Sequence, residues 1–391
     1  MLENRTRSDQ AKRYQKPLWY YGVVGLAGLA VAKLMGVTAF LPEEGLVVME
    51  KDGPRATTWP MGDAQAHGLN EGALVELASL VGGSGFVAHR GIGVYRWGFD
   101  HRPRYAASVK KSLISVMMLQ AVEAGLIGGI DEAVVRFEPR LAGLNGGVDA
   151  GITWRHLANM TSGYGMADRP GEAFAYNDYA VALWYDTLMD KVYREKGTAV
   201  LRRQLAEPLG FEDEVTFQAF GPKGPEPKLR ISARDLARFG QLLMDRGMVR
   251  GRRLLSEQSM KTMIGSVVPW ETPLSTGEPA EMISGQKSVG GTWNISPIGP
   301  GRYSFHLWVN RAADGEKLML ADAPEDTLLA SGKWGETTLW VIPSLELVVA
   351  WNGSAIDDHH LGHGDREAEM NVAARLMVKA VREPDLVALA D

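Results

Sequence analysis

The chain has 391 residues, of which 45% are hydrophobic and 23% are charged, a balance typical of a globular protein. Its formal net charge of −5 gives no overall basic field, so we expect no nucleic-acid partner. The absence of cysteine excludes disulfides, thiolate zinc sites and a cysteine nucleophile.

The N-terminal segment predicts a membrane anchor. Residues 1–17 are rich in Lys and Arg, and residues 18–41 contain only one charged side chain, Lys33. An apolar stretch of about 20 residues can cross a bilayer, and a basic flank favours a cytoplasmic N-terminus. We therefore expect a cytoplasmic tail over 1–17, a transmembrane signal anchor over 18–41 and a linker over 42–70. The remaining chain would lie outside the cytoplasm, at the inner membrane of a bacterium and in its periplasm.

Two other interpretations of this segment stay open. The small residues of "AVA" (30–32) and "VTA" (37–39) could be followed by a signal-peptidase cut, which would release the chain. The stretch could also be a buried helix of a soluble protein. Lys33 is the main argument against a transmembrane span, since a charge within a membrane is costly unless it reaches the interface.

The first elements after the linker are a hairpin and a helix. Residues 83–98 read "GSGFVAHRGIGVYRWG", two strands around a glycine-bearing turn. They also match a G-x-G-x-x-A dinucleotide fingerprint, but a strand follows these glycines where the fingerprint requires a helix. Residues 108–126 have helical periodicity and end at glycines.

Helices and loops follow, and strands return near the end of the chain. Residues 231–248 predict an amphipathic helix with Ser232 as its N-cap. Strands are expected at 302–310, 337–343 and 346–353, and a closing helix at 367–383. Strands at both ends with helices between them indicate an α+β fold over residues 71–391. Its antiparallel sheet is flanked by helices, a mostly helical region is inserted, and one transmembrane helix precedes it.

The helix over 108–126 begins with the parts of a nucleophilic site. Ser108 and Lys111 are three residues apart, so they share one face of a helix. A serine hydroxyl needs a base beside it, and a lysine serves as a base when apolar surroundings or a like charge lower its pKa. The apolar residues after Lys111 and the charge of Lys110 would do this. The helix N-terminus would add N–H groups for an oxyanion.

Taken alone, this motif is weak. Ser108 could be a simple N-cap with Lys110 and Lys111 in solvent. A second S-x-x-K match, "SGQK" at 284–287, lies in a glycine-rich loop. Four further blocks follow Ser108 in order along the chain: "HLANMTSGYG" (156–165), "FAYNDYAVAL" (174–183), "ISARDLARFG" (231–240) and "ASGKWGETTLWVIPSLELVVAWNG" (330–353).

From about residue 70 to its end, this pattern resembles the serine β-lactamase and penicillin-binding protein superfamily. It is most similar to the class C β-lactamase-like hydrolases, which include esterases, D-aminopeptidases and nylon-oligomer hydrolases. The resemblance implies Ser108 as nucleophile, Lys111 as its lysine and Tyr176 as the tyrosine that moves the proton to the leaving group. It also implies that Lys333 binds a substrate carboxylate or supports the proton network. The backbone N–H groups of Ser108 and Glu336 would form the oxyanion hole.

Two positions depart from the family pattern. Asp178 stands where an Asn is usual, and it would repel substrate carboxylates and cannot donate through an amide. Trp334 replaces a small hydroxyl residue and should narrow the pocket at the "KWG" block. We expect both side chains, with Lys333, to contact substrate. Both changes weaken a β-lactamase interpretation more than a serine-hydrolase interpretation.

The sequence therefore predicts a membrane-tethered serine hydrolase that cleaves an amide or ester bond of a small molecule through an acyl-enzyme on Ser108. One alternative is a non-catalytic, membrane-tethered binding or sensor module with the same fold. Another is a DD-peptidase or β-lactamase. The cluster "DDHHLGHGD" (357–365) could bind a transition metal, but a polar surface loop explains it equally well, so we expect no metal and no cofactor.

Overall fold

The computed structural model describes residues 59–219, 227–286, 293–294, 299–312, 317–356 and 368–383. All of them belong to one compact unit, Val47–Asp391. The predicted tail and anchor, most of the predicted linker and the 357–365 cluster lie outside the described residues. Within the described ranges, no helix is both long and apolar enough to cross a membrane.

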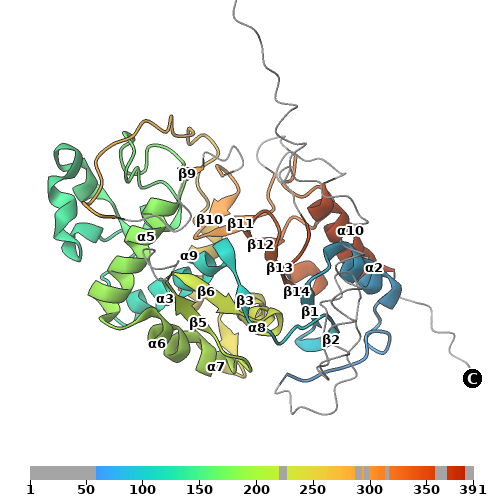
Figure 1. Ribbon diagram of the computed structural model, residues 1–391. Helices are drawn as coiled ribbons and strands as arrows, with labels where there is room; N and C mark the ends of the chain where they lie inside the picture. Colours follow the sequence, from blue (N-terminus) through green and yellow to red (C-terminus); the bar gives the residue numbers. More distant parts are fainter. Residues whose placement is uncertain are drawn as a thin grey trace, which may run out of the picture. The chain divides into compact units, whose positions relative to one another are not determined.

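The centre of the fold is a seven-stranded sheet in which every neighbouring pair is antiparallel (Figure 1). Strands from both ends of the domain build it. In sheet order they are β10 Tyr303–Ser304, β11 Leu307–Val309, β12 Leu328–Gly332, β13 Thr337–Ile342, β14 Leu347–Asn352, β1 Ser84–His89 and β2 Ile92–Trp97.

Helices cover both faces of this sheet. Helices α2 (Glu71–Val81) and α10 (Glu369–Arg382) pack together on one face, and α8 (Ala233–Met244) packs on the other (Figure 1). Successive residues of the central strands alternate between these two layers: Leu339 and Val341 join the α8 side, while Trp340 and Ile342 join the α2–α10 side. Strands β13, β14 and β1 are buried on both faces along their whole length.

A mostly helical region lies between β2 and β10, as the sequence predicted. Its helices are η2 Ala107–Val109, α3 Lys110–Glu123, η3 Val134–Arg136, η4 Pro139–Gly151, α4 Trp154–Ala158, α5 Asp178–Asp186, η5 Thr187–Tyr193, α6 Gly197–Leu201, η6 Arg202–Ala206, α7 Glu207–Leu209 and α9 Glu257–Gly265; η7 Pro343–Leu345 joins β13 to β14. Its short strands are β3 Arg104–Tyr105, β4 Tyr176–Asn177, β5 Thr216–Gln218, β6 Lys228–Ile231, β7 Met248–Val249, β8 Arg252–Arg253 and β9 Trp293–Asn294.

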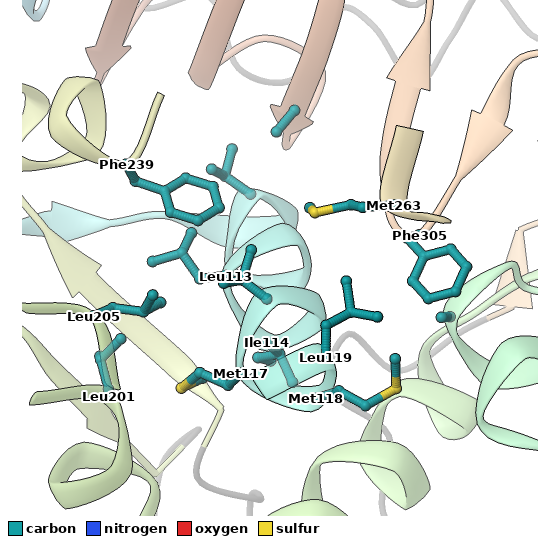
Figure 2. Close-up of a cluster of buried hydrophobic side chains, with 14 of the residues drawn as sticks. Leu113, Ile114, Met117, Met118, Leu119, Leu201, Leu205, Phe239, Met263 and Phe305 are labelled. Atoms are coloured by element: carbon teal, nitrogen blue, oxygen red, sulfur yellow. The ribbon is translucent and has the colours of Figure 1, made fainter. Parts of the chain in front are cut away.

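Helix α3 is the core of this region. Its residues from Lys110 to Ala121 are all buried, and Figure 2 shows apolar side chains around it on every side. Leu113 and Met117 lie among Leu201, Leu205 and other side chains of the inserted helices. A helix held by so many contacts gives the residues at its N-terminus a fixed position.

Most predicted elements are confirmed. The hairpin over 83–98, the capped helix after Ser232, the strands near 337–353 and the closing helix are present. The strand predicted over 302–310 is instead two strands, because Phe305 and His306 have φ of 45° and 63° and form a tight turn.

The structure also differs from the sequence prediction at the start of the domain. Trp59, placed in the linker, is buried against Phe86, with ring centroids 4.9 Å apart. Its indole N–H donates to the Gly91 carbonyl at 3.1 Å. The packed domain therefore begins no later than Trp59, because an indole buried against the sheet is part of its core.

Candidate active site

Ser108 lies in the single turn η2, directly before α3, and not inside the helix proper. Ala107, the residue before it, has a φ of 44°, a left-handed conformation that costs a non-glycine residue about 1 kcal/mol or more. The N-cap of α3 is Val109, and no side chain caps the helix. The simple N-cap interpretation of Ser108 is therefore wrong.

The ammonium group of Lys111 connects three other side chains. Its Nζ lies 3.1 Å from Ser108 Oγ, 2.7 Å from the Tyr176 hydroxyl and 3.1 Å from Asp178 Oδ1, and it donates to all three. The lysine side chain is only 1% exposed. Three predicted site residues thus meet at a fourth, Lys111, and two of them, Tyr176 and Asp178, lie 65 and 67 positions after it in the sequence.

The local structure around Tyr176 explains how it reaches Lys111. The Asn177 side chain accepts from the N–H groups of Tyr179 and Ala180 and so caps α5, which places Asp178 at the first helical position. The Asn177 amide also donates to the Tyr164 carbonyl at 2.7 Å. This asparagine therefore orients the chain between Tyr176 and Asp178.

Aromatic rings hold the Tyr176 side chain from the other side. Its ring stacks on Trp308 at an interplanar angle of 8° and meets Tyr303 edge-on, with centroids 6.2 and 6.0 Å away. Both partners lie in the segment predicted as one strand, and nothing in their own sequence pattern indicates a contact with Tyr176. The backbone of Trp293–Asn294 pairs with Tyr176–Asn177 as well.

The sequence predicted a lowered pKa for Lys111, and this prediction is wrong. Burial alone would lower the pKa of Lys111, but the neighbouring Tyr176 and Asp178 outweigh burial and raise it above its ordinary value. This raised pKa favours the ammonium form of Lys111 over the free base. The negative charge of Asp178 is directed at this ammonium, so Asp178 balances a buried cation.

Lys110 is the lysine whose pKa is lowered. It is 3% exposed, and burial, followed by the like charge of Lys111, lowers its pKa to about 7. The alternative in which both lysines are solvated is therefore wrong. The sequence pointed to Lys110 only as a neighbouring charge and did not indicate that it is buried.

The "KWG" block forms the turn between β12 and β13. Lys333 and Trp334 have φ of 50° and 55°, and the Lys333 ammonium forms an ion pair with Glu336. The side chain of Lys333 is 65% exposed, and Trp334 is 45% exposed. Both residues thus lie at a solvent-facing rim, where they remain predicted substrate contacts.

The backbone N–H of Glu336, expected as an oxyanion donor, makes a hydrogen bond within a turn. It donates to the Lys333 carbonyl at 3.2 Å, and its role at an oxyanion stays a prediction. Strand β12 approaches the turn of the nucleophile closely at Gly332. A Cβ atom there would lie 2.8 Å from the Ala106 carbonyl oxygen and 2.9 Å from the Ser108 nitrogen.

The chain is similar to known proteins of one family. A family model described as "Beta-lactamase" matches residues 74–369. Similar solved structures include a family VIII carboxylesterase (13% identity, TM-score 0.57, covering 81% of this chain and 98% of that one). A penicillin-binding protein homologue from Caulobacter crescentus has 13% identity, a TM-score of 0.55 and coverage of 82% and 97%.

A β-lactamase from Mycobacterium bovis is 18% identical, with a TM-score of 0.51 and coverage of 79% and 98%. At such identities these likenesses indicate a shared fold. No curated protein matched the sequence.

We expect Asp178→Asn to lower the pKa of Lys111. Asp178 is one of the two groups that raise this pKa, so the ammonium should lose its proton at a lower pH when the carboxylate becomes an amide. Titration of ¹³C-labelled lysine side chains by NMR would measure the change. The control is Asp190→Asn, an exposed residue of η5. A Lys111 pKa that stays the same in both variants would contradict the assigned role of Asp178.

We expect Gly332→Ala to slow the reaction of Ser108 with a fluorophosphonate roughly 100-fold. The added methyl group would push β12 away from the turn that carries Ser108, and a displacement of about 1 Å at a reacting group costs on this scale. Intact-mass spectrometry over time gives the rate. Ser331→Ala, on the opposite face of the same strand, should react as the parent does; equal slowing in both variants would refute the close-approach argument.

Proposed function

The chain belongs to the β-lactamase family, and from this premise we propose that it is a serine hydrolase acting on an amide or ester bond of a small molecule. The observation that carries the proposal is the buried Lys111 ammonium in contact with the hydroxyl groups of both Ser108 and Tyr176. A structural lysine would need only one carboxylate partner, and Asp178 supplies that. The two hydroxyl contacts beside it are the arrangement that an activated serine requires.

In the proposed acylation, Ser108 Oγ attacks the carbonyl carbon of the substrate. Tyr176, as phenolate, accepts the serine proton, and the Lys111 ammonium 2.7 Å away stabilises the phenolate charge. Lys111 keeps its own proton throughout, which agrees with its raised pKa. Tyr176 then gives the proton to the leaving alcohol or amine as the carbon–heteroatom bond breaks, leaving an ester on Ser108.

The carbonyl oxygen of the substrate becomes negative during this attack and needs N–H donors. We assign the first donor to the backbone of Ser108. We assign the second to the backbone of β12 at Gly332, where this strand approaches Ser108. Hydrolysis of the ester completes the cycle: water attacks the same carbonyl carbon, Tyr176 takes its proton, and the acid leaves as Ser108 recovers its hydroxyl hydrogen.

The substrate class proposed here is a small amide or ester rather than a β-lactam. Trp334 stands where the resemblance leads one to expect a small hydroxyl residue, and its indole lies at the rim of the site. The similar solved structures include a carboxylesterase as well as β-lactamase and penicillin-binding folds, so the fold itself fits each of these activities.

We expect a fluorophosphonate to add once to the chain, at Ser108, and the adduct to disappear in Ser108→Ala. Ser112, buried and bonded to the Val109 carbonyl, is a matched control: Ser112→Ala should still be labelled. Intact-mass spectrometry of residues 43–391 measures both. A stable adduct with penicillin would favour a DD-peptidase or β-lactamase. No adduct on folded protein would refute the hydrolase and favour a non-catalytic binding module.

We further propose that residues 18–41 anchor this hydrolase domain at the bacterial inner membrane, with the domain in the periplasm. The apolar stretch and its basic flank support this. The full chain, expressed in a bacterium, should remain in the membrane pellet after an alkaline carbonate wash, whereas residues 43–391 should be released. Release of both forms, with the N-terminal peptide missing from the full-length product, would instead support a cleaved signal peptide.

A further inference from the structure

The hairpin of β10 and β11 lies at the edge of the seven-stranded sheet, where Phe305 and His306 form its turn. Two residue pairs join β10 to β11, and two join β11 to β12. This hairpin nevertheless supplies Tyr303 and Trp308, the two rings that hold Tyr176. A ladder this short gives little rigidity, so the position of Tyr176 depends on the other contacts of the hairpin.

The backbone of the turn is bound to the end of α4. The Phe305 N–H donates to Asn159 Oδ1 at 2.8 Å, and the His306 N–H donates to the Ala158 carbonyl at 3.1 Å. The Phe305 side chain is buried in the core around α3, as Figure 2 shows. These contacts hold the turn at the inserted helices and direct the neighbouring His306 side chain into the interior.

The His306 side chain connects the hairpin to α3 and α5. Its Nδ1 lies 3.0 Å from Ser115 Oγ, on α3, and the two atoms share a hydrogen bond. Its ring lies against that of Trp184, on α5, with centroids 4.5 Å apart, and it meets Tyr303 edge-on at 6.0 Å. One imidazole thus contacts α3 and α5, whose first turns carry site residues, and β10, which supports Tyr176.

Two features of His306 are costly for the fold. Its backbone has a φ of 63°, a left-handed conformation that is uncommon outside glycine. Its ring is buried, and its Nε2 atom makes no hydrogen bond to any described residue. Burial, followed by the charge of Lys111, holds the pKa of His306 well below its ordinary value, so the ring is uncharged. An apolar side chain would avoid the unpaired nitrogen, so the bond to Ser115 is what distinguishes histidine here.

We propose that His306 is a positioning residue for acylation: its hydrogen bond to Ser115 fixes the β10–β11 hairpin against α3 and so holds the Tyr176 hydroxyl in place. In that place the hydroxyl lies 2.7 Å from Lys111 Nζ. The inference rests on the proposed hydrolase function, in which Tyr176 carries the proton. His306 acts through the two aromatic rings of the hairpin. Release of the hairpin from α3 would move these rings, and a small displacement of the hydroxyl slows proton transfer.

Ser115→Ala tests the proposal without altering the strained turn. The variant loses the bond to His306, and Ser108 should then react with a fluorophosphonate about tenfold more slowly, as intact-mass spectrometry over time would show. The pKa of Lys111 should also fall, because burial lowers this pKa and the contact with Tyr176 opposes burial. Titration of ¹³C-labelled lysine side chains by NMR measures this second change, which a loss of stability alone does not produce in folded protein.

Two further variants show whether the hydrogen bond is the cause. Ser112→Ala removes another buried hydroxyl of α3, one that donates to the Val109 carbonyl, and it should react as the parent does. His306→Asn keeps a polar atom at about the place of Nδ1 and suits a left-handed backbone, so its rate should stay within about threefold of the parent. Circular dichroism would identify a variant that fails to fold. If His306→Asn does not fold, Ser115→Ala and Ser112→Ala carry the test.

The outcomes separate this proposal from the hydrolase proposal. An unchanged Lys111 pKa or a parental rate in Ser115→Ala overturns the positioning role and leaves the hydrolase in place. Equal slowing in Ser112→Ala, or in folded His306→Asn, also overturns it, because the hydrogen bond would not be the cause. If Ser108 of the parent does not react, the hydrolase proposal fails. A Lys111 pKa that falls in Ser115→Ala alone would then still support the positioning role, and an unchanged pKa would overturn it.

Discussion

A lysine ammonium that is buried must have partners, and this requirement organises the site. Lys111 cannot keep its charge at 1% exposure unless oxygen atoms surround it, and the chain supplies them from Ser108, Tyr176 and Asp178. The last two come from a segment more than 60 residues away. The ion contacts therefore dock the start of α5 against the start of α3, and the aromatic side chains of β10 and β11 close over Tyr176.

Rigid surroundings make these contacts reproducible from one molecule to the next. Helix α3 is packed on all sides, and Asn177 caps α5 directly beside Tyr176. The third support is β12, which approaches the turn of Ser108 so closely that only glycine fits at position 332. The nucleophile thus lies where a helix, a capped helix start and a strand meet, and each is fixed by its own packing. Such convergence is what positions reacting groups to within fractions of an ångström.

Periodicity and short-range spacing predicted much of this structure, whereas contacts between distant segments could not be predicted from the sequence. The hairpin around Arg90 and the helix capped by Ser232 follow from local rules, and the order of the sequence blocks indicated Ser108, Lys111 and Tyr176 together. The predicted direction of the Lys111 pKa shift was wrong, because the shift depends on how near Tyr176 and the Asp178 carboxylate lie, and no sequence pattern encodes those distances. Similarly, the hydrogen bond of the Glu336 N–H within a turn could not be predicted, because the left-handed residues of that turn, Lys333 and Trp334, are not glycines.

The pairing of β1 with β14 determines when the sheet can fold during synthesis of the chain. Ser84 to His89 find their partners at Leu347 to Asn352, more than 250 residues later, so the centre of the sheet cannot close until most of the chain has been synthesised. Until then β1 presents an unpaired edge that other chains could join. Folding should therefore be slow and largely post-translational, and a chaperone that shields the β1–β2 hairpin would have the most to protect.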